Sequence, residues 1–194
     1  MKRTTGWIGV AGIAAIVVVI GVWVWNPWSG SPTSSDGPTA ASSSDGSDVE
    51  VGPNVGQRAP AFTLSALDGS EVSLADYEGQ PVILEFWASW CPNCNATAPH
   101  LEEFARRHED VAVVGINMGV NETDEQIQSF VDEHGIGFPV ALDDGSVTET
   151  YRVTKTSTYV FIDAQGIIRE IKAGVKLDLS DFETAYTNTL NSEG

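Results

Sequence analysis

The chain has 194 residues, and its 27 acidic side chains outnumber 10 Lys and Arg residues, which gives a formal net charge of −17 at pH 7. A chain this negative repels phosphate backbones, which argues against nucleic-acid binding. We interpret the acidity as adaptation to a salty exterior, because a Debye length of about 3 Å at molar salt screens most of the self-repulsion. An ordinary acidic surface that aids solubility is the alternative.

The N-terminal segment predicts a membrane anchor. Lys2 and Arg3 lie in residues 1–6, and residues 7–25 form an uncharged run rich in Ile, Val, Ala and Gly. As a helix this run spans about 28 Å, close to the thickness of a bilayer core. The positive-inside rule then keeps residues 1–6 in the cytoplasm and places the rest outside, as a single-pass protein of the cell membrane. A cleaved signal peptide is the alternative, but the run is long for one.

Residues 26–52 predict a disordered linker. The stretch 29–48 is made almost wholly of Ser, Gly, Pro, Thr, Ala and Asp, which cannot bury a hydrophobic core. A flexible chain of this length has a root-mean-square span of roughly 25–30 Å. The linker would therefore keep the following domain near the membrane while it turns toward different partners.

Residues 53–194 are long enough for one globular domain. Pro92 suits the first turn of a helix, and Gly135 suits the end of one. Strands that alternate with helices, followed by a hairpin and a helix, predict an α/β fold with a mixed central sheet and helices on both faces. The hydrophobic patterns place strands at 62–64, 71–74, 81–87, 111–117, 159–163 and 167–172, and helices at 92–108, 123–134 and from 178 or 180 onward.

The two cysteines of the chain predict a redox pair. Cys91 and Cys94 lie three residues apart in the sequence WCPNC, directly after the predicted strand 81–87. A thiol at the start of a helix meets the positive end of the helix dipole, which favours the nucleophilic thiolate of Cys91. Cys94, one turn later, can then attack a mixed disulfide and release the partner. A bond between them closes too short a loop to stabilise the fold much.

Other uses of the pair are weaker. A structural zinc site needs four ligands, and His100, His108 and His134 are scattered along the sequence. Copper carriers space their cysteines more widely and add a distant histidine. An inert pair is a further alternative. We therefore expect no metal and no cofactor.

Glu85 interrupts the apolar strand that precedes the cysteines. Burying a carboxylate is costly unless it has a partner or a role. Near the thiols it could take and return the proton that Cys94 must lose. The alternatives are that Glu85 faces solvent or makes a purely structural pair.

These motifs resemble a known family. The sequence FWASWCPNC at 86–94, followed by Pro99, resembles the thioredoxin superfamily. The longer pattern, with GQRAPAFTL at 56–64 and matches from 114 to 153, is similar to its TlpA/ResA-like branch of membrane-anchored, extracytoplasmic thiol–disulfide oxidoreductases. The resemblance implies a thioredoxin-like fold with an N-terminal hairpin extension and an inserted αβ unit.

The resemblance also implies an activity. It predicts a protein that reduces disulfide-containing proteins and receives electrons from a membrane-embedded thiol carrier, in the setting of cytochrome c maturation. We also expect a monomer. Trp90 would line the site, and Pro92 and Asn93 would contact substrate between the cysteines.

One position departs from the family pattern. Such proteins carry a cis-proline in the loop facing the cysteines, and Ser157 stands there in this chain, after Thr156. A cis bond before a non-proline residue costs about 2.5–4 kcal/mol, so we expect a trans bond or a strained loop. We still assign Thr156 and Ser157 to the substrate-binding edge.

Two further functions stay open. The sequence 59–62 (APAF) also resembles peroxiredoxins, thiol peroxidases that carry Thr or Ser three residues before the reactive cysteine and Pro four residues before that. Ala88 and Leu84 stand at those positions. A non-catalytic binding or metal-delivery module is the second alternative, suggested by Ser157.

Overall fold

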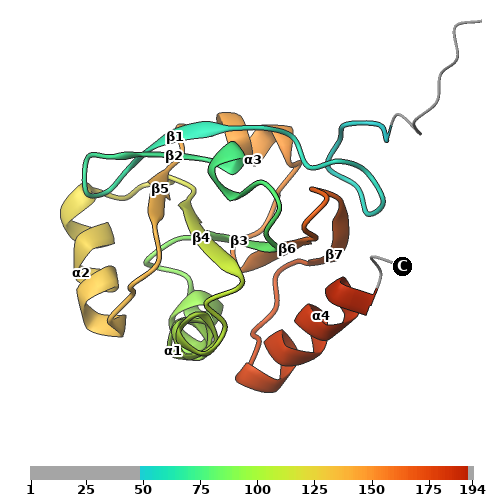
Figure 1. The fold of residues 1–194 in the computed structure, drawn as a ribbon. Coiled ribbons are helices and arrows are strands. Elements are labelled where there is room, and N and C mark those ends of the chain that lie inside the picture. Colours follow the sequence, from blue (N-terminus) through green and yellow to red (C-terminus); the bar gives the residue numbers. More distant parts are fainter. Residues whose placement is uncertain (1–48, 192–194) are drawn as a thin grey trace, which may run out of the picture. The chain divides into compact units, whose positions relative to one another are not determined.

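The computed structural model describes residues 49–191 (Figure 1). The predicted anchor at 7–25 and nearly all of the predicted linker lie outside these residues. Within residues 49–191, no helix is long and apolar enough to cross a membrane.

A mixed sheet forms the centre of residues 49–191, with seven strands in the order β2-β1-β5-β4-β3-β6-β7 (Figure 1). The central strand β3 runs parallel to β4 and antiparallel to β6. This confirms the predicted mixed sheet. The strands are β1 (Thr63–Ala66), β2 (Glu71–Ser73), β3 (Val82–Trp87), β4 (Ala112–Asn117), β5 (Val140–Leu142), β6 (Thr158–Ile162) and β7 (Ile168–Lys172).

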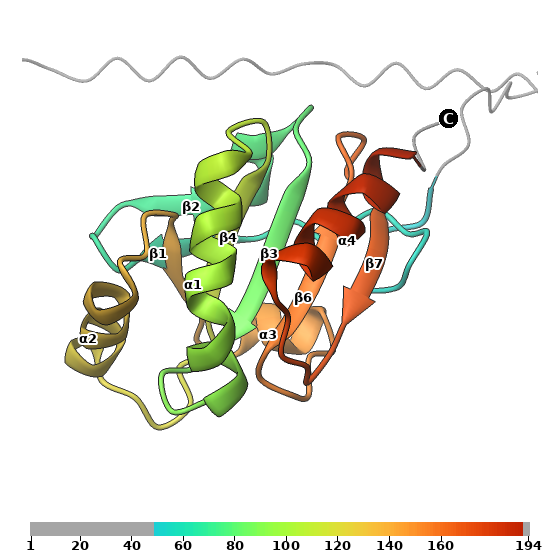
Figure 2. The same ribbon diagram turned by 90° about the horizontal axis from the view of Figure 1, so that it is seen from below.

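Helices cover both faces of the sheet, as predicted. On one face lie α1 (Pro92–Arg107) and α4 (Leu179–Asn191), side by side in Figure 2. Phe104 of α1 and Phe182 of α4 pack there against Ile83 of β3. On the other face α3 (Ser146–Thr150) and the 3-10 helix η1 (Leu74–Tyr77) cover a second cluster, in which Val147 packs with Leu84. Alternate residues of β3 therefore enter different cores.

The remaining helix, α2 (Asp124–His134), lies between β4 and β5 in the chain. Its Phe130 stacks on Trp87 with ring centroids 4.4 Å apart. Together α2 and β5 form the inserted αβ unit that the resemblance implies. The hairpin β1–β2 pairs with β5 and so extends the sheet beyond that unit. Both additions to the thioredoxin-like core are thus present.

The register of the sheet brings two distant segments to one place. β3 leads into α1 through residues 88–91, so the cysteines lie at the end of β3. Because β6 runs antiparallel to β3 with Phe86 opposite Thr158, the residue before β6, Ser157, lies beside that same end.

Candidate redox site

Cys91 and Cys94 form a disulfide bond at the start of α1, with Cα atoms 5.2 Å apart. Cys91 is the N-cap residue, and the backbone N–H of Cys94 donates a hydrogen bond to Cys91 Sγ at 3.1 Å. This donor and the helix dipole would both stabilise a thiolate on Cys91. Cys91 is 3% exposed and Cys94 is 0% exposed, so only the first cysteine reaches the surface at all.

The predicted rim residues flank the disulfide. Trp90 is 53% exposed, and its indole N–H donates to the carbonyl of Val120 at 2.9 Å, which ties the ring to the loop after β4. Pro92 is the exposed first residue of α1. The side-chain amide of Asn93 donates to the carbonyl of Gly174 at 3.3 Å. The rim therefore joins α1 to the loops after β4 and β7.

Ser157 lies under the site rather than on its rim. Within residues 49–191 no peptide bond is cis, and Ser157 adopts φ 60°, a left-handed conformation that costs a non-glycine residue about 1–2 kcal/mol. Its side chain is fully buried and donates to the carbonyl of Val175 at 2.6 Å. Its own carbonyl accepts from the backbone N–H groups of Gly174 and Val175. Thr156, by contrast, is half-buried. The contact of Thr156 and Ser157 with a substrate stays a prediction.

Glu85 is buried on the face of β3 that α1 covers. Only 4% of the residue is exposed, so it does not face solvent. The hydroxyl of Tyr159 lies 3.1 Å from Glu85 Oε1 and donates to the ionised carboxylate. Burial raises the pKa of Glu85 from 4.5 to about 7, and the hydrogen bond with Tyr159 opposes that rise.

Tyr159 is a residue of the site that the sequence did not reveal. It stands directly opposite Glu85 in the register of β3 and β6. Burial raises its pKa, and the negative charge of Glu85 raises it further. A hydroxyl at every second residue, Ser157 and Tyr159, was the available signal, because alternate residues of a strand share a face.

A second set of missed residues holds the loop before the cysteines. Glu122 accepts a hydrogen bond from the backbone N–H of Ser89 at 2.6 Å and another from the amide of Asn117 at 2.9 Å. On the other side, Asn95 donates to the carbonyl of Ser89 at 2.9 Å and to that of Cys91 at 3.0 Å. Side chains from α1 and from the loop after β4 thus fix the backbone that presents Cys91.

The site offers no hydroxyl where a peroxiredoxin would carry one. Ala88 is fully buried in the cluster that contains both cysteines and Trp87. Among residues 49–191, no group of three or more His, Cys, Asp or Glu side chains gathers as a metal site would require.

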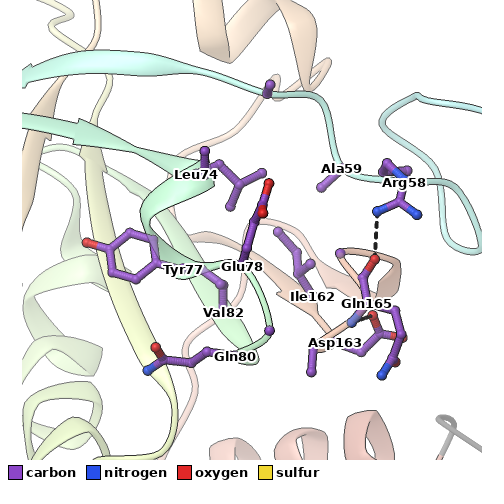
Figure 3. Close-up of a pocket in the computed structure, with 15 residues that line it drawn as sticks. Arg58, Ala59, Leu74, Tyr77, Glu78, Gln80, Val82, Ile162, Asp163 and Gln165 are labelled. Carbon is purple, nitrogen blue, oxygen red and sulfur yellow. Dashed lines mark hydrogen bonds between the residues drawn. The ribbon is translucent and has the colours of Figure 1, made fainter.

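Figure 3 shows the residues that line a cavity of about 430 Å³. Its walls include Val82 and Ile162, which pair at the opposite end of the β3–β6 ladder from Phe86 and Thr158. At its mouth the Arg58 side chain donates to the carbonyl of Gln165 at 2.7 Å (Figure 3). No cysteine lines this cavity, so it is separate from the redox site.

A disulfide that caps the first helix after the central strand of such a sheet defines a thioredoxin-like thiol–disulfide oxidoreductase. The chain belongs to the AhpC/TSA family, whose model matches residues 55–171.

Relatives and solved structures agree with this assignment. The thioredoxin-like protein YneN of Bacillus subtilis is 35% identical over 127 residues, which are 64% of this chain and 75% of the relative. The thiol-disulfide oxidoreductase ResA of Bacillus thuringiensis is 35% identical over 120 residues, 61% of this chain and 69% of the relative.

Among solved structures, a secreted Mycobacterium tuberculosis disulfide oxidoreductase homologous to E. coli DsbE aligns with a TM-score of 0.60 and 29% identity, over 65% of this chain and 94% of that one. StoA from Bacillus subtilis aligns with a TM-score of 0.57 and 26% identity, over 66% and 96%.

Proposed function

We propose that this protein reduces disulfide bonds in other proteins outside the cytoplasmic membrane, with Cys91 as the attacking thiol and Cys94 as the resolving thiol. The observation that carries the proposal is the position of Cys91 as N-cap, where the Cys94 N–H lies 3.1 Å from its sulfur. The difference in burial supports the order of attack, because Cys94 is fully enclosed.

The reaction starts from the reduced pair. The Cys91 thiolate attacks one sulfur of a substrate disulfide, a bond forms between Cys91 and that sulfur, and the other substrate sulfur leaves as a thiolate that takes a proton. Cys94 gives its proton to the carboxylate of Glu85 and attacks Cys91. The Cys91–Cys94 bond forms, the bond from Cys91 to the substrate breaks, and the second substrate thiolate takes the proton from Glu85. Two electrons and two protons have then passed to the substrate.

The cycle closes when a donor reduces the Cys91–Cys94 bond. We propose a membrane-embedded thiol carrier as that donor and cytochrome c maturation as the setting. The apolar run at 7–25 and the linker at 26–52 support a protein tethered to the outer side of the membrane. We propose that it acts as a monomer. The relative named thiol-disulfide oxidoreductase ResA supports the same class of reaction.

The proposal is tested with reduced full-length protein and a protein disulfide such as insulin. Cys91→Ser should abolish reduction, and Cys94→Ser should accumulate a mixed disulfide visible on a non-reducing gel. A Cys91→Ser variant that reduces insulin at the wild-type rate would contradict the proposal. Turnover of hydrogen peroxide by the wild type at a higher rate than disulfide reduction would favour the thiol peroxidase. Metal binding to the reduced protein without disulfide reduction would favour the delivery module.

A further inference from the structure

Three contacts connect Glu85 to the loop after β7. The Tyr159 hydroxyl lies 3.1 Å from Glu85 Oε1 and 3.1 Å from Ser157 Oγ. Ser157 Oγ lies 2.6 Å from the carbonyl oxygen of Val175. The three side chains are 4%, 0% and 0% exposed in the order Glu85, Tyr159, Ser157, so water does not readily replace any of these contacts.

The number of hydrogen atoms available to these three contacts depends on the charge of Glu85. The Val175 carbonyl can only accept, so it takes the Ser157 proton. When Glu85 is ionised, Tyr159 must donate to it, and no hydrogen remains between Tyr159 and Ser157. When Glu85 is protonated, Glu85 donates to Tyr159, Tyr159 to Ser157, and Ser157 to Val175. All three contacts are then hydrogen bonds, against two in the ionised state.

We propose that Ser157 is a positioning residue that raises the proton affinity of Glu85 through Tyr159, because protonation of Glu85 completes the row of hydrogen bonds that ends at Val175. A contact between two buried oxygens with no hydrogen between them is unfavourable, and only a proton on Glu85 removes it. Burial raises the pKa of Glu85 to about 7 and so acts in the same direction, whereas the direct hydrogen bond from Tyr159 opposes the rise.

The other groups around Glu85 do not change this count. On β4 the residue in register with Glu85 is Gly115, which has no side chain to titrate. On α1 the cysteines are joined in the disulfide, and the Thr97 hydroxyl, which hydrogen-bonds with Tyr159, lies outside the three contacts that are counted. From α4, Phe182 packs against the Tyr159 ring. Burial and Tyr159 are the two influences on the pKa of Glu85.

A higher proton affinity suits the role that the proposed function gives to Glu85. A thiol has an ordinary pKa of about 8.5 and a glutamate about 4.3, so proton transfer from Cys94 to an ordinary carboxylate is unfavourable by about four powers of ten. Each unit by which the pKa of Glu85 rises makes the transfer tenfold less unfavourable. The hydroxyl of Ser157 would thus assist Cys94 from a position where the resemblance predicts a proline.

The test follows the side-chain carboxyl of Glu85 by 13C NMR as a function of pH, with oxidised full-length protein in detergent and Glu85→Gln to assign the signal. Ser157→Ala should lower the titration midpoint by one unit or more. The variant lacks the Ser157–Tyr159 contact, so Tyr159 can donate to the ionised carboxylate without leaving two buried oxygens in contact with no hydrogen between them. Tyr159→Phe should raise it, because the carboxylate loses its donor. Ser157→Gly gives the same test if the alanine variant does not fold, since glycine accepts a positive φ.

Thr158→Ala is the matched control. It removes a neighbouring buried hydroxyl that donates to the Lys155 carbonyl and takes no part in the contacts from Glu85 to Val175. The midpoint should therefore stay unchanged. An unchanged or raised midpoint in Ser157→Ala, a lowered one in Tyr159→Phe, or an equal shift in Thr158→Ala would overturn the inference. Because the titration uses no substrate and no free thiol, its result is independent of whether the protein reduces proteins. The inference rests on the proposed function only for the role of Cys94.

Discussion

Glu85 and Tyr159 face each other across the antiparallel pair β3–β6, with the phenolic oxygen 3.1 Å from Glu85 Oε1. The pair lies beneath the first turns of α1, the helix that begins with the disulfide. A carboxylate in the centre of the sheet costs stability when it is charged, so the fold itself should respond to pH through this one residue.

The free energy of unfolding should fall between pH 4.5 and 7 because of Glu85. Its pKa is about 7 in the folded protein and ordinarily 4.5, so over this range the unfolded chain has lost a proton that the folded protein keeps. The contribution of Glu85 to the free energy of unfolding is therefore largest below pH 4.5, falls as the pH rises, and no longer changes above pH 7. A rise of about 2.5 units corresponds to about 3 kcal/mol.

Urea unfolding of the oxidised wild type and Glu85→Gln across this range checks the prediction. The other carboxyl groups contribute equally to both proteins, so the difference between the two curves isolates Glu85. A difference that stays flat from pH 4.5 to 8 would show that burial does not raise the pKa of Glu85.

Trp90→Ala should weaken the use of protein substrates without impairing the cysteines. The ring is 53% exposed beside the disulfide, and exposed tryptophans often dominate binding at protein surfaces. We expect KM for a protein disulfide to rise about 5- to 30-fold, which corresponds to about 1–2 kcal/mol. The rate with a small aromatic disulfide should stay within about twofold. Trp90→Phe keeps an aromatic ring but loses the hydrogen bond to Val120, so its KM should lie between those of the wild type and Trp90→Ala. Equal losses of activity with both substrates would instead place Trp90 in the redox step.

Phe182→Ala should destabilise the domain by about 3–5 kcal/mol. The ring is fully buried, where it contacts Phe104, Tyr159 and Phe161 and holds α4 on the sheet. Leu190→Ala on the same helix is the control, because Leu190 is 39% exposed and its loss should cost less than about 1 kcal/mol. Urea denaturation followed by circular dichroism measures both. Similar losses in the two variants would contradict the packing of α4.

Gly119→Ala should cost more stability than Gly69→Ala. Both glycines have positive φ, 64° and 85°, so each alanine meets backbone strain of about 1–2 kcal/mol. At Gly119 a Cβ atom would also lie 2.6 Å from the carbonyl oxygen of Asp143, whereas at Gly69 it would meet nothing within 4 Å. Thermal unfolding of the two variants compares the effects. Equal shifts in Tm would show that the loop after β4 moves to accommodate the Cβ atom without loss of stability.

The elements with strong local signals were predicted to within one or two residues. The central strand was expected at 81–87 and runs from Val82 to Trp87, and the helix after it was expected at 92–108 and ends at Arg107. Both have long hydrophobic patterns, and the helix also has a proline at its start. The five-residue helix α3 and the 3-10 helix η1 were not predicted, because one turn is too short to show a period.

The residues of the site likewise divide into those with a local sequence signal and those without one. Cys91, Cys94 and Glu85 could be found because they lie within one short stretch of sequence, where a motif and a polar residue in an apolar strand are visible. Tyr159 is 74 residues from its partner Glu85, and Glu122 is 33 residues from Ser89. Those contacts arise from strand register and loop closure, which hydrophobic periodicity does not encode.

The left-handed backbone at Ser157 restricts which residues this position can accept. Proline fixes φ near −65°, whereas Ser157 has φ 60°. A single Ser157→Pro replacement would therefore clash with the existing loop, and the carbonyl of residue 157 would have to release the amides of Gly174 and Val175. A proline at this position would require changes in two loops at once, so the surrounding structure itself favours a residue other than proline here.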